Sequence, residues 1–347
     1  AQARQRLDEA GSLGDQALAP VRLFVALLEP ELQLAEGKLD AARQGFAQAE
    51  QLAMEELDGQ PSPATWQARY GLGRVLRRQG KHEAALTAFR SALTHLEELG
   101  QRTALQEDRA PFFANHRALV DDTLSLLLEL HRPEEALVVA DGAQAQVLRG
   151  MEAAGRLQRL SAEQVREWAR RVATYRLSRD RLETLRSQIR RSAGPARTAL
   201  EQQLEAQRQD SSRCFEAAFA HLDEVAPVAS PISLPPAALS TALAPGEALL
   251  ELVAIGPQWH GFWLAGGKLS HQLQQGSTLL APWTKELRSS VHHLFVVSGG
   301  HPQAAALAGE EHPAGGPLLE HVTLSYLPHA GFLLRRPRAV TGAALIV

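Results

Sequence analysis

Residues 71–92, GLGRVLRRQGKHEAALTAFRSA, constrain the fold more than any other stretch of the sequence. Apolar residues recur at steps of three and four on either side of a turn at Gly80-Lys81, which predicts two amphipathic helices folded back on each other. Small residues at Gly73, Ala85 and Ala92 fall where the two helices would have to touch closely. The stretch therefore predicts a helix–turn–helix unit.

The same offsets recur twice more in the first 150 residues, which are rich in strong helix formers. A turn at Gly37-Lys38 is followed by Ala42, Phe46 and Ala49, and a turn at His131-Arg132-Pro133 is followed by Ala136, Ala140 and Ala143. Helix breakers are expected at Asp58-Gly59, at Pro61 to Pro63 and at Gly100. Three stacked units predict a helical solenoid, and a generic helical bundle is the alternative.

The unit resembles the tetratricopeptide repeat, whose signature positions would be filled by Gly73, Gly80, Ala85, Phe89 and Ala92. This resemblance implies an all-α domain over residues 1–150. It also implies a groove that binds a protein or peptide partner.

Residues 151–226 predict a long helical hairpin that connects two domains. The first helix has a narrow apolar seam, broken at Ser192 to Pro195, and the second helix carries further apolar residues. The seam residues are Val165, Trp168, Val172, Tyr175, Leu182 and Ile189, and those of the second helix are Leu200, Leu204, Phe215, Phe219 and Leu222. Between Arg156 and Arg213 there are 14 arginines and 7 acidic residues, so nucleic-acid binding is an alternative; solvated outer faces are favoured because aromatic residues do not interleave.

Composition excludes several classes of protein. The net charge of −3 gives no general attraction to nucleic acid or anionic membranes, and no apolar run is long enough to cross a bilayer. The single cysteine, Cys214, excludes an internal disulfide and fits a reducing cytosol, so we expect a soluble cytoplasmic protein. Its neighbours predict a packed thiol on a helix. The sequence starts without methionine, as a processed chain or a piece of a longer one would.

After Pro227 to Pro236 the spacing of the apolar residues changes, and residues 227–347 predict an α/β domain. Alternating apolar residues separated by glycine turns predict a meander of antiparallel strands. A short helix at Leu279 to Ser290 should precede a buried strand that ends in Ser298-Gly299-Gly300. The expected strands are residues 248–255, 259–264, 269–273, 293–297 and 321–327; a short helix should end at Leu333 to Arg336, before a strand at Ala343 to Val347.

The order of these segments resembles the CHAT family, which consists of caspase-like, separase-related domains that follow tetratricopeptide repeats. The best matching stretches are Ala281-Pro282-Trp283, His293 to Val297 and Val322 to Pro328. The chain departs from the family at Ser298 to Pro302, where a Pro-Asp-Gly loop is usual, and in the short spacing between Leu273 and His293. The expected fold class is thus α+β multidomain, with an incomplete α/β caspase-like domain after the repeats and the hairpin.

The resemblance implies cysteine peptidase chemistry by a His–Cys dyad, in which histidine removes the thiol proton and the thiolate attacks the peptide carbonyl. The family's His-Gly and Ala-Cys motifs would follow the strand at Ala343 to Val347, so no catalytic residue is assigned. We expect a bacterial sensor or scaffold with the first half of a peptidase domain, active only with a downstream dyad. A non-catalytic adaptor is the alternative. The final strand lacks neighbours, which predicts association with the C-terminal half or with another chain.

No metal or cofactor site is expected. Eight histidines lie between positions 260 and 329, but none has a metal-ligand spacing such as HxH or HExxH. Ser298-Gly299-Gly300 lacks the GxSxG and phosphate-loop patterns, so a loop turning on two glycines is favoured. His301 beside that loop is the one histidine with a candidate functional role. The eight are His260, His271, His292, His293, His301, His312, His321 and His329.

Overall fold

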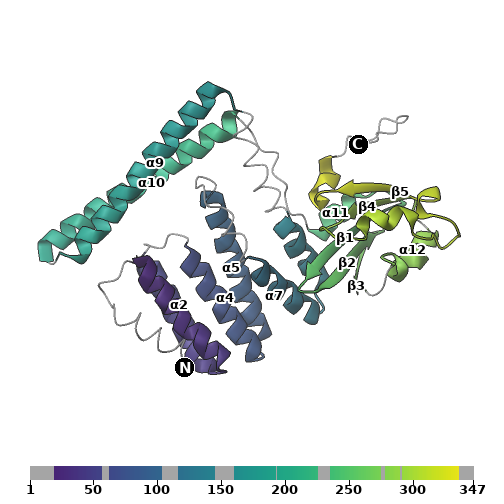
Figure 1. Ribbon diagram of the computed structural model, residues 1–347, viewed down its shortest axis with the longest axis horizontal. Helices are drawn as coiled ribbons and strands as arrows, with labels where there is room; N and C mark the ends of the chain where they lie inside the picture. The colour runs from purple at the N-terminus through teal and green to yellow at the C-terminus, as the bar shows by residue number, and fades with distance from the viewer. Residues whose placement is uncertain are drawn as a thin grey trace. The chain divides into compact units, whose positions relative to one another are not determined.

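A computed structural model describes residues 19–56, 62–103, 116–144, 160–192, 194–225, 235–274, 278–289 and 291–335 of the 347-residue chain. Contacts between residues divide the chain into two compact units. One unit consists of residues 1–146 and 231–347, and the other of residues 147–230. The first unit contains the helical repeats and a sheet, and the second contains a long helical hairpin (Figure 1).

The repeats form three helical hairpins in chain order, as the sequence predicts (Figure 1). Gly100, an expected breaker, lies inside a helix instead, because a single glycine costs a helix only about 1 kcal/mol. The expected break at Asp58-Gly59 lies outside the described residues. The helices are α2 (Ala19–Ala35), α3 (Leu39–Glu56), α4 (Pro63–Arg78), α5 (His82–Thr103), α7 (His116–Glu129) and a helix over residues 133–144.

The three turns between paired helices share one backbone geometry. Gly37, Gly80 and His131 each have a positive φ, of 77°, 74° and 56°. In each turn the next residue donates its N–H to a carbonyl five positions earlier, at 2.9 Å, which is the bond that closes a Schellman motif. The third turn uses this geometry without glycine, and His131 is the one non-glycine residue with positive φ in the described ranges.

Replacing His131 with glycine is expected to stabilise the repeats by about 1 kcal/mol, because a side chain in the left-handed region costs about that much. Urea unfolding should show a higher midpoint at an unchanged slope. Gly80→His makes the reciprocal change in the equivalent turn, where a Cβ would meet nothing within 4 Å, and should destabilise by a similar amount. An unchanged midpoint in both variants would contradict the backbone explanation.

Small residues lie where the helices meet, as predicted. The alanines and phenylalanines at the predicted contacts are buried in the first two repeats, namely Ala42, Phe46, Ala49, Ala85, Phe89 and Ala92. In the third repeat Ala136 and Ala140 are buried, whereas the predicted Ala143 is only half-buried. Two glycines of α4 receive the phenylalanine rings. A Cβ at Gly71 would lie 2.2 Å from the Phe46 ring, and one at Gly73 would lie 2.5 Å from Phe89. These glycines fix the distance of α4 from α3 and α5.

Polar side chains of α4 connect the second repeat to its neighbours on both sides, with two arginines on one side and a tyrosine on the other. Arg69 pairs with Glu50 of α3 at 2.6 Å and Arg74 with Glu31 of α2 at 2.8 Å. Each of these partly exposed pairs contributes at most about 1 kcal/mol. Tyr70 of the same helix donates to Asp122 of α7 at 2.8 Å, and burial together with that carboxylate raises the pKa of its hydroxyl.

A five-stranded sheet follows the short helix α11 (Pro236–Ala242), in the strand order β3-β2-β1-β4-β5. Strands β1 (Glu247–Ile255), β2 (Gln258–Ala265) and β3 (Lys268–Leu273) form the predicted antiparallel meander, whereas β4 (His293–Val297) and β5 (Thr323–Leu327) run parallel to β1. Gly299 and Gly300, at the end of β4, both have positive φ, which confirms the predicted glycine turn. A Cβ at Gly299 would lie 2.1 Å from the Leu252 carbonyl oxygen, so this loop needs glycine.

The two faces of the sheet border different cores. On one face, Leu249, Phe262 and Phe295 join a cluster that also contains residues of α5, α7 and helix 133–144. On the other face, Leu250, Trp263 and Val296 pack under the predicted helix of 279–290, which is formed by η2 (Ala281–Trp283) and α12 (Thr284–Ser289). The described residues of this unit also include the 3₁₀ segments η3 (Ala304–Gly309), η4 (Leu318–Glu320) and η5 (Ala330–Arg335). The predicted strand at Ala343 to Val347 lies outside the described residues.

The second unit is the predicted antiparallel hairpin of α9 (Ala162–Arg190) and α10 (Gly194–Val225) (Figure 1). Trp168, Val172, Leu182 and Leu204 are buried between the helices, whereas Val165 of the predicted seam is 42% exposed. The seam also contains a polar layer that the prediction missed: the buried Ser178 accepts a hydrogen bond from Gln207 Nε2 at 2.7 Å. The side chains of Phe215, Phe219 and Leu222 lie outside the described residues.

Across the parts of the chain that the structure describes, none of the helices combines the length and the apolar character that a bilayer crossing requires.

Candidate functional site

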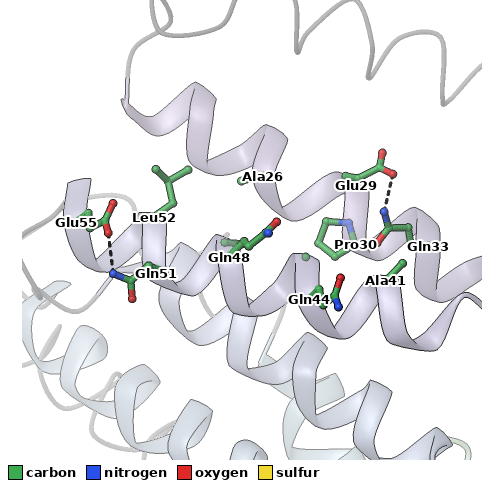
Figure 2. A pocket seen from close by; sticks show the side chains of 12 residues that line it. Ala26, Glu29, Pro30, Gln33, Ala41, Gln44, Gln48, Gln51, Leu52 and Glu55 are labelled. Carbon is green, nitrogen blue, oxygen red and sulfur yellow. Dashed lines mark hydrogen bonds between the residues drawn. The ribbon is translucent and has the colours of Figure 1, made fainter.

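A groove lies between α2 and α3 in the first repeat and has a cavity volume of about 620 Å³ (Figure 2). One face of each helix lines it. Ala26, Pro30, Gly45, Ala49 and Leu52 form its apolar part. Pro30 lies inside α2 and packs against α3, because a Cβ added at Gly45 would be 2.9 Å from the proline Cβ.

The polar side of the groove consists of hydrogen-bond acceptors and amides. Its polar side chains are Glu29, Gln33, Gln44, Gln48, Gln51 and Glu55, without a lysine or arginine among the lining residues. Glu29 accepts from Gln33 Nε2 at 2.8 Å and Glu55 from Gln51 Nε2 at 2.7 Å (Figure 2). The second amide atom of Gln33, Oε1, is buried without a hydrogen-bond partner among the described residues. Pro30 also has no N–H to donate to the carbonyl of Ala26.

Such a groove suits a ligand that donates hydrogen bonds and carries positive charge. Carboxylates attract ammonium and guanidinium groups, and glutamine amides can pair with both the N–H and the C=O of an extended peptide. The apolar floor would contact aliphatic carbons of the same ligand.

A second polar cluster lies in the interior, between helix 133–144 and the sheet. Asp141 of that helix, Glu251 of β1 and His329 after β5 each have 0% exposure. The Asp141 carboxylate accepts from the Ala330 N–H at 3.2 Å and lies 3.1 Å from His329 Nε2. The cluster is placed at the carboxyl ends of the parallel strands, where open α/β sheets commonly bind ligands.

The contacts of His329 define its tautomer. Its Nδ1 accepts from the Gly331 N–H at 2.8 Å, so the proton of a neutral ring is on Nε2, next to Asp141. Glu251 differs from Asp141 and His329, because neither of its carboxyl oxygens has a hydrogen-bond partner among the described residues. Burial raises the pKa of Glu251 well above its usual range, and the charge of Asp141 raises it further. Both effects favour the protonated form of the Glu251 carboxyl.

His301, the histidine with a candidate role, contacts Trp259 of β2 and the backbone of its own loop. Its ring packs edge-on against Trp259 with a centroid distance of 4.4 Å, and its Nδ1 accepts from the Gln303 N–H at 3.1 Å. Burial lowers its pKa, which favours the neutral ring that this contact needs. His312 accepts from the Ala314 N–H in the same way. These rings fix local turns.

Four further histidines pair with neighbours across the strands or within a loop. His260 and His271 share a 2.9 Å hydrogen bond between nearly parallel rings, and burial and the nearby His260 lower the pKa of His271 to about 4. His293 lies 2.9 Å from the Ser325 hydroxyl. His321 lies 2.7 Å from the Gly315 carbonyl oxygen. Within the described ranges, no three His, Cys, Asp or Glu side chains are arranged to hold a metal ion.

Cys214 is partly buried on α10, and burial raises the pKa of its thiol, which lowers its nucleophilicity. Many hairpin arginines pair with acidic residues one turn away, as Arg170 and Arg171 do with Glu167 and Arg197 does with Glu201. This pairing agrees with the interpretation that the hairpin arginines lie on solvated helix faces.

The interior cluster was not predicted as a site. Its one signal in the sequence is Glu251, a charged residue in the middle of the apolar strand ALLELVAI.

Comparison with known families finds a tetratricopeptide repeat at residues 31–98, which includes α3, α4 and most of α5. The chain thus contains a repeat region of a kind that generally binds protein partners and acts as a scaffold. The match ends before the sheet, so the caspase-like interpretation of the sheet depends on the sequence resemblance. No curated protein and no solved structure matches the chain.

Proposed function

We propose that the protein is a scaffold that binds a basic, extended segment of a partner protein in the groove between α2 and α3. The observation that carries this proposal is the lining of that groove, which has two carboxylates and four carboxamides but neither lysine nor arginine. The groove volume of about 620 Å³ is within the range of pockets that bury a small ligand or a few peptide side chains.

Charge reversal in the groove should test this proposal. Glu29→Lys combined with Glu55→Lys is expected to weaken binding of a lysine- and arginine-rich peptide at least about tenfold, because attraction is replaced by repulsion. Fluorescence polarisation with a labelled twelve-residue peptide would measure the dissociation constants. An acidic peptide of equal length should bind poorly to the native protein.

The matched control is Glu98→Lys combined with Glu134→Lys, which makes the same change of net charge at two exposed glutamates that do not line the groove. It should leave peptide affinity within about twofold of the native value. Equal losses in the control and the groove variant would show that the net charge attracts the peptide, and would overturn the proposal.

We further propose that the sheet is the first part of a caspase-like domain. Supporting this are the parallel arrangement of β1, β4 and β5 beside an antiparallel hairpin and the CHAT-like order of the segments. Proteolysis would then need a His–Cys dyad outside this sequence, and without one the protein would be an adaptor. The full open reading frame distinguishes the two: His-Gly and Ala-Cys motifs after Val347 favour the peptidase, and a frame lacking them favours the adaptor.

A further inference from the structure

The interior cluster lies at the contact between the third repeat and the sheet. Ala136, Leu137 and Ala140 of helix 133–144 belong to the same apolar cluster as Phe295 and Val297 of β4. Glu251 is directly opposite Val297 in the parallel pair and opposite Phe262 in the antiparallel pair, and all three point to this face of the sheet. Its fully buried carboxyl group therefore lies among apolar side chains, on the face of the sheet that packs against helix 133–144.

Among the residues that the structure describes, few charged groups are placed to compensate an ionised Glu251. On the same face of the sheet, the ionisable groups are Asp141 and His329 within the cluster, with Glu247, His260, His271 and His293 on the strands and Arg117 and Asp121 on α7. Arg117 donates to the Ala254 carbonyl and Asp121 accepts from the Gly256 N–H, so both are used at the turn after β1. The charge that acts on Glu251 is that of Asp141, which is of the same sign as an ionised Glu251.

We propose that this contact is a proton-dependent latch: helix 133–144 stays docked on the sheet while Glu251 carries a proton, and separates from it locally when that proton is lost. An ionised Glu251 would place two carboxylates in an interior that is closed to water. Separation of the helix would admit water to both groups and relieve their repulsion.

The direction of the pH dependence follows from linkage. Once the helix separates, Glu251 is in water and titrates near its ordinary value of about 4.3. In the docked state its pKa is raised, so docking retains a proton that the open state releases. Docking is therefore strongest at acidic pH and weakens up to about tenfold for each pH unit, until the pH exceeds the raised pKa. The latch would couple the repeats that bind a partner to the sheet beyond them.

Hydrogen–deuterium exchange of the full chain between pH 6 and pH 9 tests the latch, with rates corrected for the intrinsic effect of pH. The amides of helix 133–144 and β1 should lose protection as pH rises, by up to about tenfold per unit, while those of α3 in the first repeat should not. Glu251→Gln keeps the shape of the side chain and cannot ionise, so it should abolish the pH dependence. Glu247→Gln, at the first residue of β1 and on the same face of the sheet, should leave it as in the native protein.

Two results would overturn the latch. One is equal protection of helix 133–144 at pH 6 and pH 9 in the native protein. The other is a pH-dependent loss of protection in helix 133–144 that persists in the Glu251→Gln variant. If the glutamine variant folds poorly, Glu251→Met provides an apolar replacement of similar size, and the native pH profile still decides the matter without any variant.

Discussion

Replacing Gly71 with valine is expected to destabilise the repeats by about 2–3 kcal/mol, which is the upper part of the usual cost of overpacking a core. Gly71 is buried, and its Cβ would lie 2.2 Å from the ring of Phe46, which is 1% exposed. Because the ring is buried in a close-packed core, it has little room to move away. Helix propensity alone would favour valine over glycine, so a loss of stability reports the packing. Urea unfolding followed by far-UV circular dichroism would measure it.

A double-mutant cycle tests whether the Phe46 ring causes this loss. Phe46→Ala alone should cost about 3–5 kcal/mol, but Gly71→Val in that background should cost less than 1 kcal/mol, because the valine then fills part of the cavity. Ala47→Val, at an exposed position of α3, controls for valine in a helix and should change stability by only a few tenths of a kcal/mol. Additive losses in the cycle would show that Gly71 and Phe46 do not contact each other as described.

The sequence predicted the repeats well, for a physical reason. Helices that touch closely need small residues at fixed offsets, so Ala85, Phe89 and Ala92 mark a helix contact by their spacing alone. The turns were predictable because Gly37 and Gly80 adopt a conformation that glycine favours. The meander of β1, β2 and β3 followed from alternating apolar residues and glycine turns, since strand pairing at short range leaves a local pattern.

The interior cluster could not be predicted in the same way. Asp141, Glu251 and His329 are 110 and 78 residues apart in the sequence, and only the docking of the third repeat on the sheet brings them together. The groove between α2 and α3 shows a related difficulty. Its glutamines would be ordinary residues on any helix surface, and they become a binding site only where two helix faces converge. The polar layer at Ser178 likewise depends on the register between α9 and α10.

Asp141→Ala is expected to destabilise the first unit by about 3–5 kcal/mol. The substitution removes the acceptor of the Ala330 N–H and the neighbour of His329 Nε2 in a place without solvent access. Each buried donor left without a partner costs about 1–3 kcal/mol. The lower charge near Glu251 recovers part of this loss, since Asp141 raises the pKa of that carboxyl. Tryptophan fluorescence during urea unfolding is a suitable measurement, because four of the five tryptophans lie in the first unit.

Asp141→Asn separates the role of the aspartate as a hydrogen-bond acceptor from the effect of its charge on Glu251. The amide oxygen can still accept one hydrogen bond, and it carries no charge, so we expect a smaller loss of about 1–2 kcal/mol at neutral pH. Because the charge that acts on Glu251 is gone, the loss should shrink further as pH rises from 6 to 8. Asp121→Ala removes a carboxylate that accepts the Gly256 N–H in a partly exposed turn, and it should cost only about 1 kcal/mol. Similar losses for Asp141→Ala and Asp121→Ala would mean that Asp141 is an ordinary cap of a loop and that the interior cluster contributes nothing beyond that single bond.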